Sequence, residues 1–429
     1  MTTILETRPG TGFTGPVHRP GDPGYDARRA AFRPTVDSRP ELIVEAADET
    51  DVALAVRTAR ERGLDLAVQG TGHGTLVPSR GLLLRTGLLD AVTIDPHRGT
   101  ARVGAGTRWG AVVAAAAPYG LAPVSGTSFD VGVAGYTFGG GLSWRSRRCG
   151  YAADSLVRVR AATADGDVVV ASRDEHPDLF WAFRGGGGGY AVATELEFRL
   201  YPTGGLFGGR AYYPIERAAA VLAFYAGWAP SQPDELTTTV ALGRGPSELG
   251  PGRRVVIVRA VGRGPDAERA LGELCRVAGP ALGGGFGAIT YDDIPGIGDT
   301  RPMRFERVRD VPDGLVDLMI TAAGPDAHPE AAAELRFWGG ALATPPGDGG
   351  AIGHRDVPFS VILSGPPAHD ADLSGHATGG AFLNFLYDTT RTHTAFSAAG
   401  HARLRRVKRA YDPENVFATG HTVTPAERP

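Results

Sequence analysis

SGTSFDVGVAGYTFGGGLSWRSRRCGYAADSLVRVRAATADGDVV, residues 125–169, joins a glycine-rich apolar segment to two strand-like runs around the turn ADGD. Each glycine that is ordered in such a segment costs ~0.5–1 kcal/mol relative to alanine. A flat ligand that lies against bare backbone would offset this cost. We therefore expect residues 125–169 to contribute a ligand-binding surface followed by two strands with a tight turn between them.

Two further glycine clusters flank this segment. Residues 69–81 read QGTGHGTLVPSRG and follow a strand-like run, and GGGGG occupies residues 185–189. The backbone amides of residues 70–74 can form a concave phosphate site, although a simple turn explains the same glycines. The sequence has no GxxxxGK[ST] motif, and no GxGxxG opens a helix after the first strand. A pyrophosphate loop here would belong to another class.

The composition excludes several classes of protein. A chain of 429 residues with 42% hydrophobic and 21% charged residues is typical of a globular protein with two or three cores. The formal charge of -3 provides no field that favours nucleic acid or an anionic membrane. The first residues show no secretory signal, and no apolar stretch reaches the ~20 residues that cross a bilayer. We expect a cytoplasmic protein.

The two cysteines, Cys149 and Cys275, are too few for a disulfide framework or a cysteine-rich metal site. We interpret them as reduced thiols, with one bridge as the alternative, and we expect no metal ion.

Three zones follow one another along the chain. Residues 39–202 alternate strand-like and helical runs, and residues 40–72 read as a strand, a helix and a strand. Residues 203–380 contain strand-like runs such as TTTVALGRG and FSVILSG, separated by helices, which predicts an antiparallel sheet with helices on one face. Residues 381–429 are helical through HARLRRVKRAYDP and end in an extended tail.

The chain resembles the FAD-linked oxidases of the berberine-bridge-enzyme-like branch of the vanillyl-alcohol-oxidase superfamily. The matching pieces occur in family order: VQGTGHG, VGVAGYTFGGGLSWRSRRCGYAADSLV, DLFWAFRGGGGGYAVATELEFRL, FLN and VKRAYDPENVF. The resemblance implies an α+β fold with a PCMH-type FAD-binding domain of two α/β subdomains, residues 1–202, completed by residues 381–429. Residues 203–380 would form the substrate domain, with an antiparallel sheet flanked by helices.

The same resemblance assigns cofactor contacts. His73 occupies the position whose imidazole is bonded to the 8α-methyl of the flavin, a bond that raises its oxidising power; the alternative is an ordinary loop histidine. Val131 matches the position where a small residue accompanies reaction with O2, although valine also suits a buried strand. The other implied contacts are Gly70, Thr71, Gly72 and Gly74 at the pyrophosphate, Gly132, Gly135 and Gly141 along the isoalloxazine and ribityl chain, and Val192 by its backbone.

Several residues depart from the family pattern. Ser128 stands where many relatives have a second, cysteinyl flavin link, so the resemblance implies attachment through His73 only. Gly189 replaces asparagine, Ala191 replaces glycine, and Gln69 replaces an arginine that often precedes the pyrophosphate glycines.

A base for the substrate proton is expected near the end of the chain. GHARL aligns with a NYxRL-like segment and puts His401 where tyrosine would be, and the ordinary pKa of histidine, about 6.5, suits a base near neutral pH. A solvent-facing histidine on a basic helix is the alternative. Asn384 is a second catalytic candidate, with a structural role equally open.

The implied activity is an FAD-dependent oxidase. It would take two electrons from a C–H of a small molecule, an alcohol or sugar hydroxyl in a natural-product intermediate, by hydride transfer to flavin N5, with O2 reduced to H2O2. An oxidative cyclase or an amine or polyketide oxidase is the alternative, and a flavin-binding protein without turnover is a third. The oligomeric state stays open.

Overall fold

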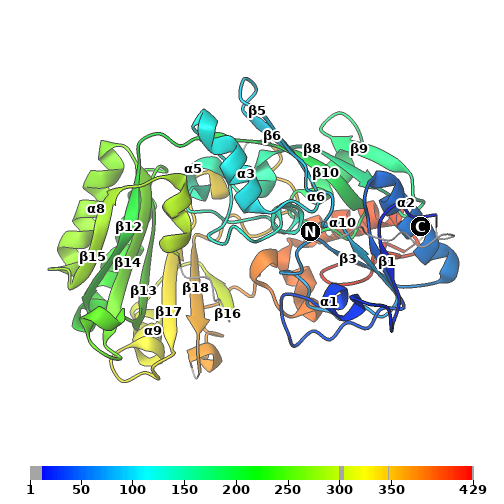
Figure 1. Cartoon of the computed structure of the whole chain (residues 1–429). Coiled ribbons are helices and arrows are strands. Elements are labelled where there is room, and N and C mark those ends of the chain that lie inside the picture. Colours follow the sequence, from blue (N-terminus) through cyan, green and yellow to red (C-terminus); the bar gives the residue numbers. More distant parts are fainter. Residues whose placement is uncertain (1–11, 299–303, 346, 367, 428–429) are drawn as a thin grey trace.

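The computed structural model describes residues 12–298, 304–345, 347–366 and 368–427. Within them the chain forms sheets of four, five, two and seven strands, connected and covered by helices, so the predicted α+β class is confirmed. Figure 1 shows the seven-stranded sheet at one end of the molecule and the two sheets of the first half at the other. The expectation that the chain starts without a secretory signal falls largely on residues 1–11, which lie outside the described residues.

The first sheet has the strand order β1-β2-β4-β3. Its strands are β1 (Val17–His18), β2 (Leu42–Glu45), β3 (Leu66–Gln69) and β4 (Leu82–Arg85). Helix α1 (Tyr25–Arg29) lies between β1 and β2 in the chain, and α2 (Glu49–Arg62) lies between β2 and β3. The Asp48 side chain accepts the Asp51 N–H at the start of α2, and Gly63 ends the helix with a left-handed φ of 64°. Both β2 and β3 pair in parallel with β4, which confirms the predicted strand, helix and strand and places residues 70–74 directly after β3.

The second sheet is antiparallel, in the order β5-β6-β10-β8-β9. Its strands are β5 (Val92–Asp95), β6 (Thr100–Gly104), β8 (Leu156–Ala162), β9 (Val168–Ser172) and β10 (Val192–Arg199). Residues such as Val103, Val159 and Leu196 point into a hydrophobic core. The two-stranded sheet pairs β7 (Leu121–Ala122) with β11 (Tyr201–Pro202).

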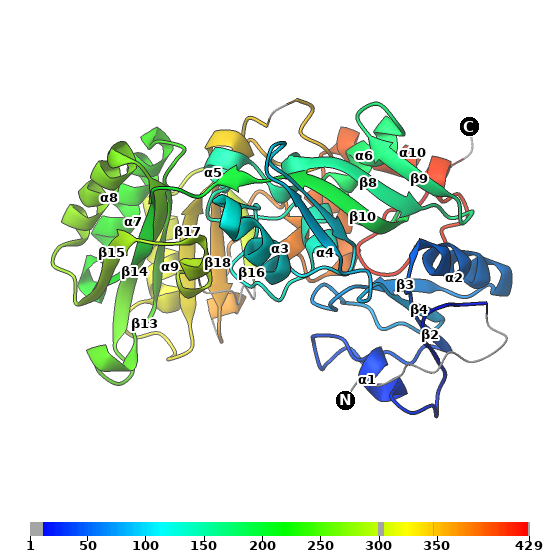
Figure 2. The same ribbon diagram turned by 45° about the horizontal axis from the view of Figure 1, so that its top comes forward.

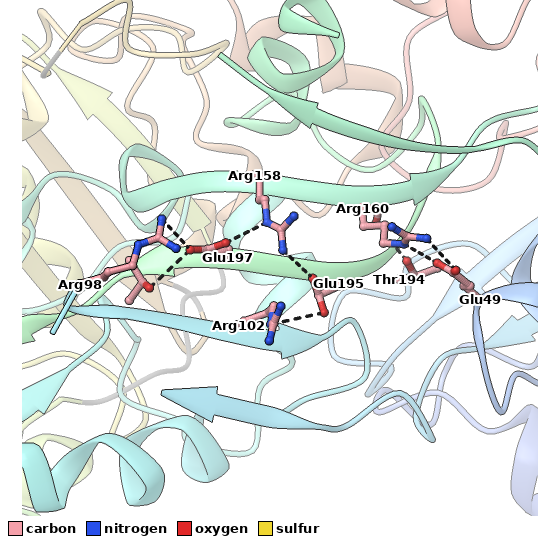
Figure 3. Close-up of polar contacts among 9 residues, drawn as sticks. Glu49, Arg98, Arg102, Arg158, Arg160, Thr194, Glu195 and Glu197 are labelled. Carbon is pink, nitrogen blue, oxygen red and sulfur yellow. Dashed lines mark hydrogen bonds and ion pairs between the residues drawn. The ribbon is translucent and has the colours of Figure 1, made fainter. Parts of the chain in front are cut away.

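The opposite face of the second sheet carries alternating charges (Figure 3). Glu197 binds Arg158 at 2.8 Å, and the Glu49 carboxylate at the start of α2 receives both Nε and Nη2 of Arg160, at 2.5 and 2.8 Å. Opposite charges on neighbouring strands attract each other, so these side chains support the strand pairing on the polar face of the sheet. The pair between Glu49 and Arg160 also joins the first sheet's helix to the second sheet.

Short helices occupy the glycine-rich segment and its surroundings. They are α3 (Trp109–Ala116), η1 (Ala117–Tyr119), α4 (Val133–Phe138), α5 (Ser146–Cys149), η2 (Ala152–Ser155) and α6 (Pro177–Phe183). Gly120 ends η1 with a left-handed φ of 64°.

The seven-stranded sheet is antiparallel throughout, in the order β15-β12-β14-β13-β17-β18-β16. Its strands are β12 (Leu206–Pro214), β13 (Thr237–Arg244), β14 (Arg254–Arg263), β15 (Gly283–Ala288), β16 (Arg304–Val308), β17 (Ala332–Phe337) and β18 (Phe359–Ser364). Helices α7 (Ala218–Trp228), α8 (Pro265–Ala278) and α9 (Asp313–Ala323) pack on one face in a large apolar core (Figure 2). The predicted antiparallel sheet with helices on one face is confirmed. The domain boundaries at residues 202 and 380 stay a prediction.

The chain then returns to its first half through η9 (Leu383–Phe385), η10 (Thr389–Ala395) and α10 (Ala398–Tyr411). Lys408 of α10 is fully buried, and its Nζ donates to Asp412 at 2.6 Å and to the carbonyls of Gly189 and Phe417 at 2.7 and 2.9 Å. The last helix is therefore bonded to the run of five glycines.

Both cysteines are free, Cys149 in α5 and Cys275 in α8, as predicted. Within the ranges given above, no helix combines the length and the apolar character that a membrane span requires.

Replacement of Lys408 tests whether its buried ammonium group is needed to hold α10 against the first half of the chain. Lys408→Met leaves Asp412 as an unpaired buried charge, and we expect a loss of about 3–5 kcal/mol in the free energy of unfolding. The measurement is guanidinium unfolding followed by tryptophan fluorescence. Arg406→Met, an exposed position on the same helix, is the control and should cost less than ~0.5 kcal/mol. Equal stability of the two variants would contradict this role for Lys408.

Candidate active site

One cavity of about 1260 Å³ lies between the first half of the chain, the last segment and the seven-stranded sheet. A small-molecule site usually has ~300–1,000 Å³, so this cavity has room for more than a single small ligand. Four parts of the chain line it: residues 66–77, residues 126–144, strands β13, β14, β17 and β18, and residues 383–387 with 417–422. Gly187, Gly188 and Gly189 lie between these parts.

The loop after β3 carries His73 on the cavity wall. The His73 Nδ1 lies 3.0 Å from the Thr71 hydroxyl, which also accepts the N–H of Gly132 at 3.2 Å. The ring of Phe32 stacks on the imidazole, with the ring centroids 4.0 Å apart and the planes 19° from parallel. Gln69 fixes the start of the loop, because its amide donates to Ala30 O at 2.9 Å.

The surroundings of His73 favour a neutral imidazole. Burial lowers its pKa below the ordinary value of 6.5, and the nearby Arg108 guanidinium lowers it further, while Asp130 opposes both. A neutral ring keeps a lone pair on one nitrogen near neutral pH. An unprotonated imidazole at the edge of the cavity has the lone pair that a nucleophile requires and that an imidazolium lacks.

The glycine-rich segment forms a second wall of bare backbone. Val131, Gly132 and Gly135 line the cavity at α4. A Cβ atom added to Gly135, or to Gly74 in the first loop, would meet no atom within 4 Å and would project into open space. These are the places at which a flat or extended ligand can approach the main chain.

Gly141 does not line the cavity, unlike the other nine predicted cofactor contacts. It has a left-handed φ of 76°, and a Cβ there would lie 2.5 Å from the Tyr136 ring. Glycine is needed at this position for the turn itself, and its contact with the cofactor stays a prediction.

The side chain of Asn384 bridges the last segment and the glycine-rich segment. Its Oδ1 accepts the Gly141 N–H at 2.8 Å, and its Nδ2 donates to Tyr136 O at 3.1 Å. Asn384 lines the cavity, but both ends of its amide are engaged by backbone. This arrangement supports positioning of the wall and leaves no free group for proton transfer.

His401 does not reach the cavity. It lies in the first turn of α10, with its ring stacked at 6.3 Å on Phe396 and 6.5 Å from the ring of His393. Burial, Arg405 and His393 lower its pKa. The geometry therefore does not support the predicted base at His401, because the alignment of GHARL locates the helix and not the direction of one ring on it.

Another histidine, not predicted, does line the cavity. His421 Nε2–H donates to Leu386 O at 2.8 Å, and its Nδ1 lies 2.7 Å from the Thr392 hydroxyl. Burial lowers its pKa, against smaller opposite effects of the Leu386 carbonyl and Asp388. Its hydrogen bonds hold the final strand-like tail against η9 and η10.

The sheet contributes a charged group that the sequence interpretation missed. Glu334 Oε1 accepts from Arg336 Nη2 at 2.7 Å, and Glu334 Oε2 accepts from Arg259 Nη1 at 3.0 Å. All three residues line the cavity, and the Arg336 guanidinium lies 5.5 Å from the centre of the Trp144 ring. A charged residue in the middle of a buried strand was the signal that could have found them.

The site's residues fit FAD. The cavity is large, two of its walls are bare glycine backbone, and His73, whose pKa is lowered by burial, lines it. Gly70, Thr71, Gly72, Gly74 and Val192 line the same space as the α4 residues.

Two family models match the chain. The FAD binding domain model matches residues 40–172, and the berberine and berberine-like model matches residues 381–424. The first match contains the His73 loop and the glycine-rich segment, and the second contains Asn384 and His421.

Relatives with known names cover nearly the whole chain. (R)-6-Hydroxynicotine oxidase of Paenarthrobacter nicotinovorans is 28% identical over 459 residues, which covers 96% of this chain and 97% of that protein. The crystal structure of 6-hydroxy-D-nicotine oxidase from Arthrobacter nicotinovorans has a TM-score of 0.81 at 25% identity and covers 98% of this chain and 100% of its own. Glucooligosaccharide oxidase from Acremonium strictum shares the fold, with a TM-score of 0.79 at 21% identity over 96% of this chain and 98% of its own.

These matches agree with the motifs and with the cavity that the motifs line. The chain is an FAD-dependent oxidoreductase and belongs to the FAD-linked, berberine-bridge-enzyme-like superfamily.

Proposed function

We propose that the protein is an FAD-dependent oxidase of a small-molecule substrate with O2 as the electron acceptor. The observation that carries the proposal is the continuous cavity, which joins the His73 loop to the polar inner face of the seven-stranded sheet. Its volume of about 1260 Å³ suits a cofactor and a substrate side by side.

The chain's own residues would hold the cofactor on two walls. Thr71, Gly72 and Gly74 would offer backbone amides to the pyrophosphate, while Gly132 and Gly135 leave room for a flat ring system. Bound FAD supplies the acceptor for two electrons from a substrate C–H. The closing segment around Asn384, Phe385 and Leu386 would keep bulk water away from the reacting atoms.

His73 would bind the flavin covalently, through the 8α-methyl. Three features support this: burial lowers the pKa of the imidazole, Phe32 stacks on its ring, and it lies on the cavity wall. The Acremonium strictum glucooligosaccharide oxidase carries a 6-S-cysteinyl, 8α-N1-histidyl FAD. Ser128 lines the cavity here and cannot form a cysteinyl link, so we propose one attachment only.

The substrate would be an alcohol or sugar hydroxyl of a natural-product intermediate. Polar side chains of the sheet face the same space as the cofactor wall, which suits a substrate with several polar groups. An amine oxidase is the second candidate, favoured by the similarity to (R)-6-hydroxynicotine oxidase along 97% of that protein. An oxidative cyclase would differ by a new C–C or C–N bond in its product.

Peroxide release tests the activity directly. Holoprotein is mixed with alcohols, sugars and secondary amines, and peroxidase-coupled dye formation measures H2O2. We expect one class to give peroxide in equal amount to the O2 consumed. Substrate that bleaches the flavin without air but gives no peroxide in air would rule out an oxidase, and a flavin that no compound bleaches would indicate binding without turnover.

Removal of the imidazole tests the covalent link. After acid precipitation, the flavin colour should stay with the wild-type polypeptide and appear in the supernatant of His73→Ala. His97→Ala, an exposed histidine in the turn between β5 and β6, should retain the colour. Attachment of FAD to apoprotein should fall as the pH drops through the His73 pKa, which lies below 6.5, because the protonated ring has no lone pair. Release of the flavin colour from the wild-type protein would contradict this proposal.

Enlargement of Val131 tests the access of O2. Val131→Leu should slow reoxidation of the reduced protein by air about tenfold, equivalent to ~1.4 kcal/mol in the barrier, because the larger side chain fills cavity space. Stopped-flow absorbance of the flavin measures this rate. Val170→Leu on β9, away from the cavity, should reoxidise at the wild-type rate. Unchanged reoxidation of Val131→Leu would remove this residue from the oxygen path.

A further inference from the structure

The inner face of the seven-stranded sheet carries four arginines in one row. Cross-strand pairing places Thr239 opposite both Arg259 and Arg336, and Ser360 opposite both Arg336 and Arg307. Directly paired residues point to the same face of a sheet. Arg210 of β12, which is exposed, is paired with Arg259. The arginine row therefore runs Arg210, Arg259, Thr239, Arg336, Ser360 and Arg307 across six neighbouring strands.

The next row along the sheet contains one carboxylate. Ala241 is paired with Ile257 and Glu334, and Ile362 with Glu334 and Phe305. Glu334 is the shared partner of Arg259 and Arg336, at 3.0 and 2.7 Å. Two guanidinium groups, which are always charged, thus share a single carboxylate and leave one surplus positive charge on the cavity wall.

Both arginines have limited contact with bulk water. The Arg259 side chain is 6% exposed and that of Arg336 is 18% exposed. The Arg259 Nε is buried and has no hydrogen-bond partner among the described residues. The other charged residues of the lining sheet region, Arg244 and Glu330, are exposed and carry opposite charges.

Arg307 adds to the same field from behind the wall. It is 1% exposed, its Nη2 donates to His354 O, and its guanidinium lies 4.1 Å from the centre of the Trp338 ring. It has no carboxylate partner among the described residues. A buried surplus charge is costly unless a ligand or another ion pairs with it.

We propose that Arg259 and Arg336 bind a carboxylate group of the substrate, so that the enzyme oxidises an anionic small molecule. This inference rests on the proposed function, since it names the substrate class for the same cavity. A planar guanidinium, with several N–H donors in one plane, pairs well with a carboxylate. The assignment narrows the substrates to hydroxy acids, sugar acids and related carboxylates.

The experiment measures anion binding to the holoprotein without turnover. Acetate and benzoate are titrated against their neutral isosteres acetamide and benzamide by isothermal titration calorimetry. Each carboxylate should bind at least about tenfold more tightly than its amide, since a hydrogen bond to a charged group is the stronger one. Higher ionic strength should weaken carboxylate binding and leave amide binding unchanged.

Variants that differ in net charge at this wall test whether carboxylate affinity follows that charge. R336Q removes the surplus charge, E334Q adds a second one, and the double variant R336Q/E334Q restores one. Carboxylate affinity should fall about tenfold or more in R336Q, rise in E334Q and return toward the wild-type value in the double variant. R309Q, at an exposed arginine paired with Asp356, is the control and should bind as the wild type does. The double variant has the same net charge at the wall as the wild type. Comparison of the double variant with E334Q therefore still tests the effect of charge if R336Q alone folds poorly.

Several results would overturn the inference. Equal affinities for carboxylates and amides would do so, as would affinities that do not follow the charge order. A shift of the flavin midpoint potential in R336Q with unchanged carboxylate affinities would assign the arginines to the cofactor. Peroxide release separates a failure of this inference from a failure of the proposed function. Turnover of neutral alcohols without carboxylate binding would overturn only the inference. Carboxylate binding that follows the charge order, without any peroxide release, would overturn only the oxidase activity.

Discussion

The amide of Asn384 connects two parts of the chain that lie 243 residues apart, and the cavity depends on this connection. Its oxygen takes the N–H of Gly141 and its nitrogen binds the carbonyl of Tyr136, so both ends of a tight glycine turn are held from outside. A Cβ on Gly139 would lie 2.4 Å from this amide, which explains why the neighbouring position must be bare. Lys408 makes the equivalent connection on the other side, between α10 and Gly189. The cofactor walls come from the first half of the chain, but buried polar groups of the second half keep them in place.

Much of this architecture is readable from the sequence because it depends on local chemistry. Asp48 caps α2, Gly63 and Gly120 end helical segments in left-handed conformations, and the loop after β3 begins where its apolar run stops. The same reasoning, combined with the family resemblance, located nine cavity-lining residues among the ten predicted cofactor contacts. Gly141 was the exception, because a glycine required by packing against Tyr136 has the same appearance in a sequence as one that faces a ligand.

The substrate side could not be predicted in this way. Arg259 and Arg336 lie 77 positions apart and meet only through the strand between them, whose register no local pattern specifies. Alternation along β14 and β17 indicates which residues share a face, but not which face the helices cover. His401 shows the related limit for helices: its position at the start of α10 was predictable, whereas the direction of its ring depends on packing against Phe396. Residues that act across tertiary contacts therefore needed the structure.

The outermost strand of the large sheet, β15, consists of GGGFGA and is mostly exposed. Gly284 has a left-handed φ of 71°, and Gly209 on the paired strand has a φ of 146°, so the edge is irregular. An open sheet edge normally exposes a row of N–H and C=O groups to which another molecule can add a strand. Glycine has low strand propensity and offers no side chains for such an addition. The irregular, glycine-rich edge is thus a poor template for the addition of a strand from another molecule, even though it is the exposed border of the largest sheet.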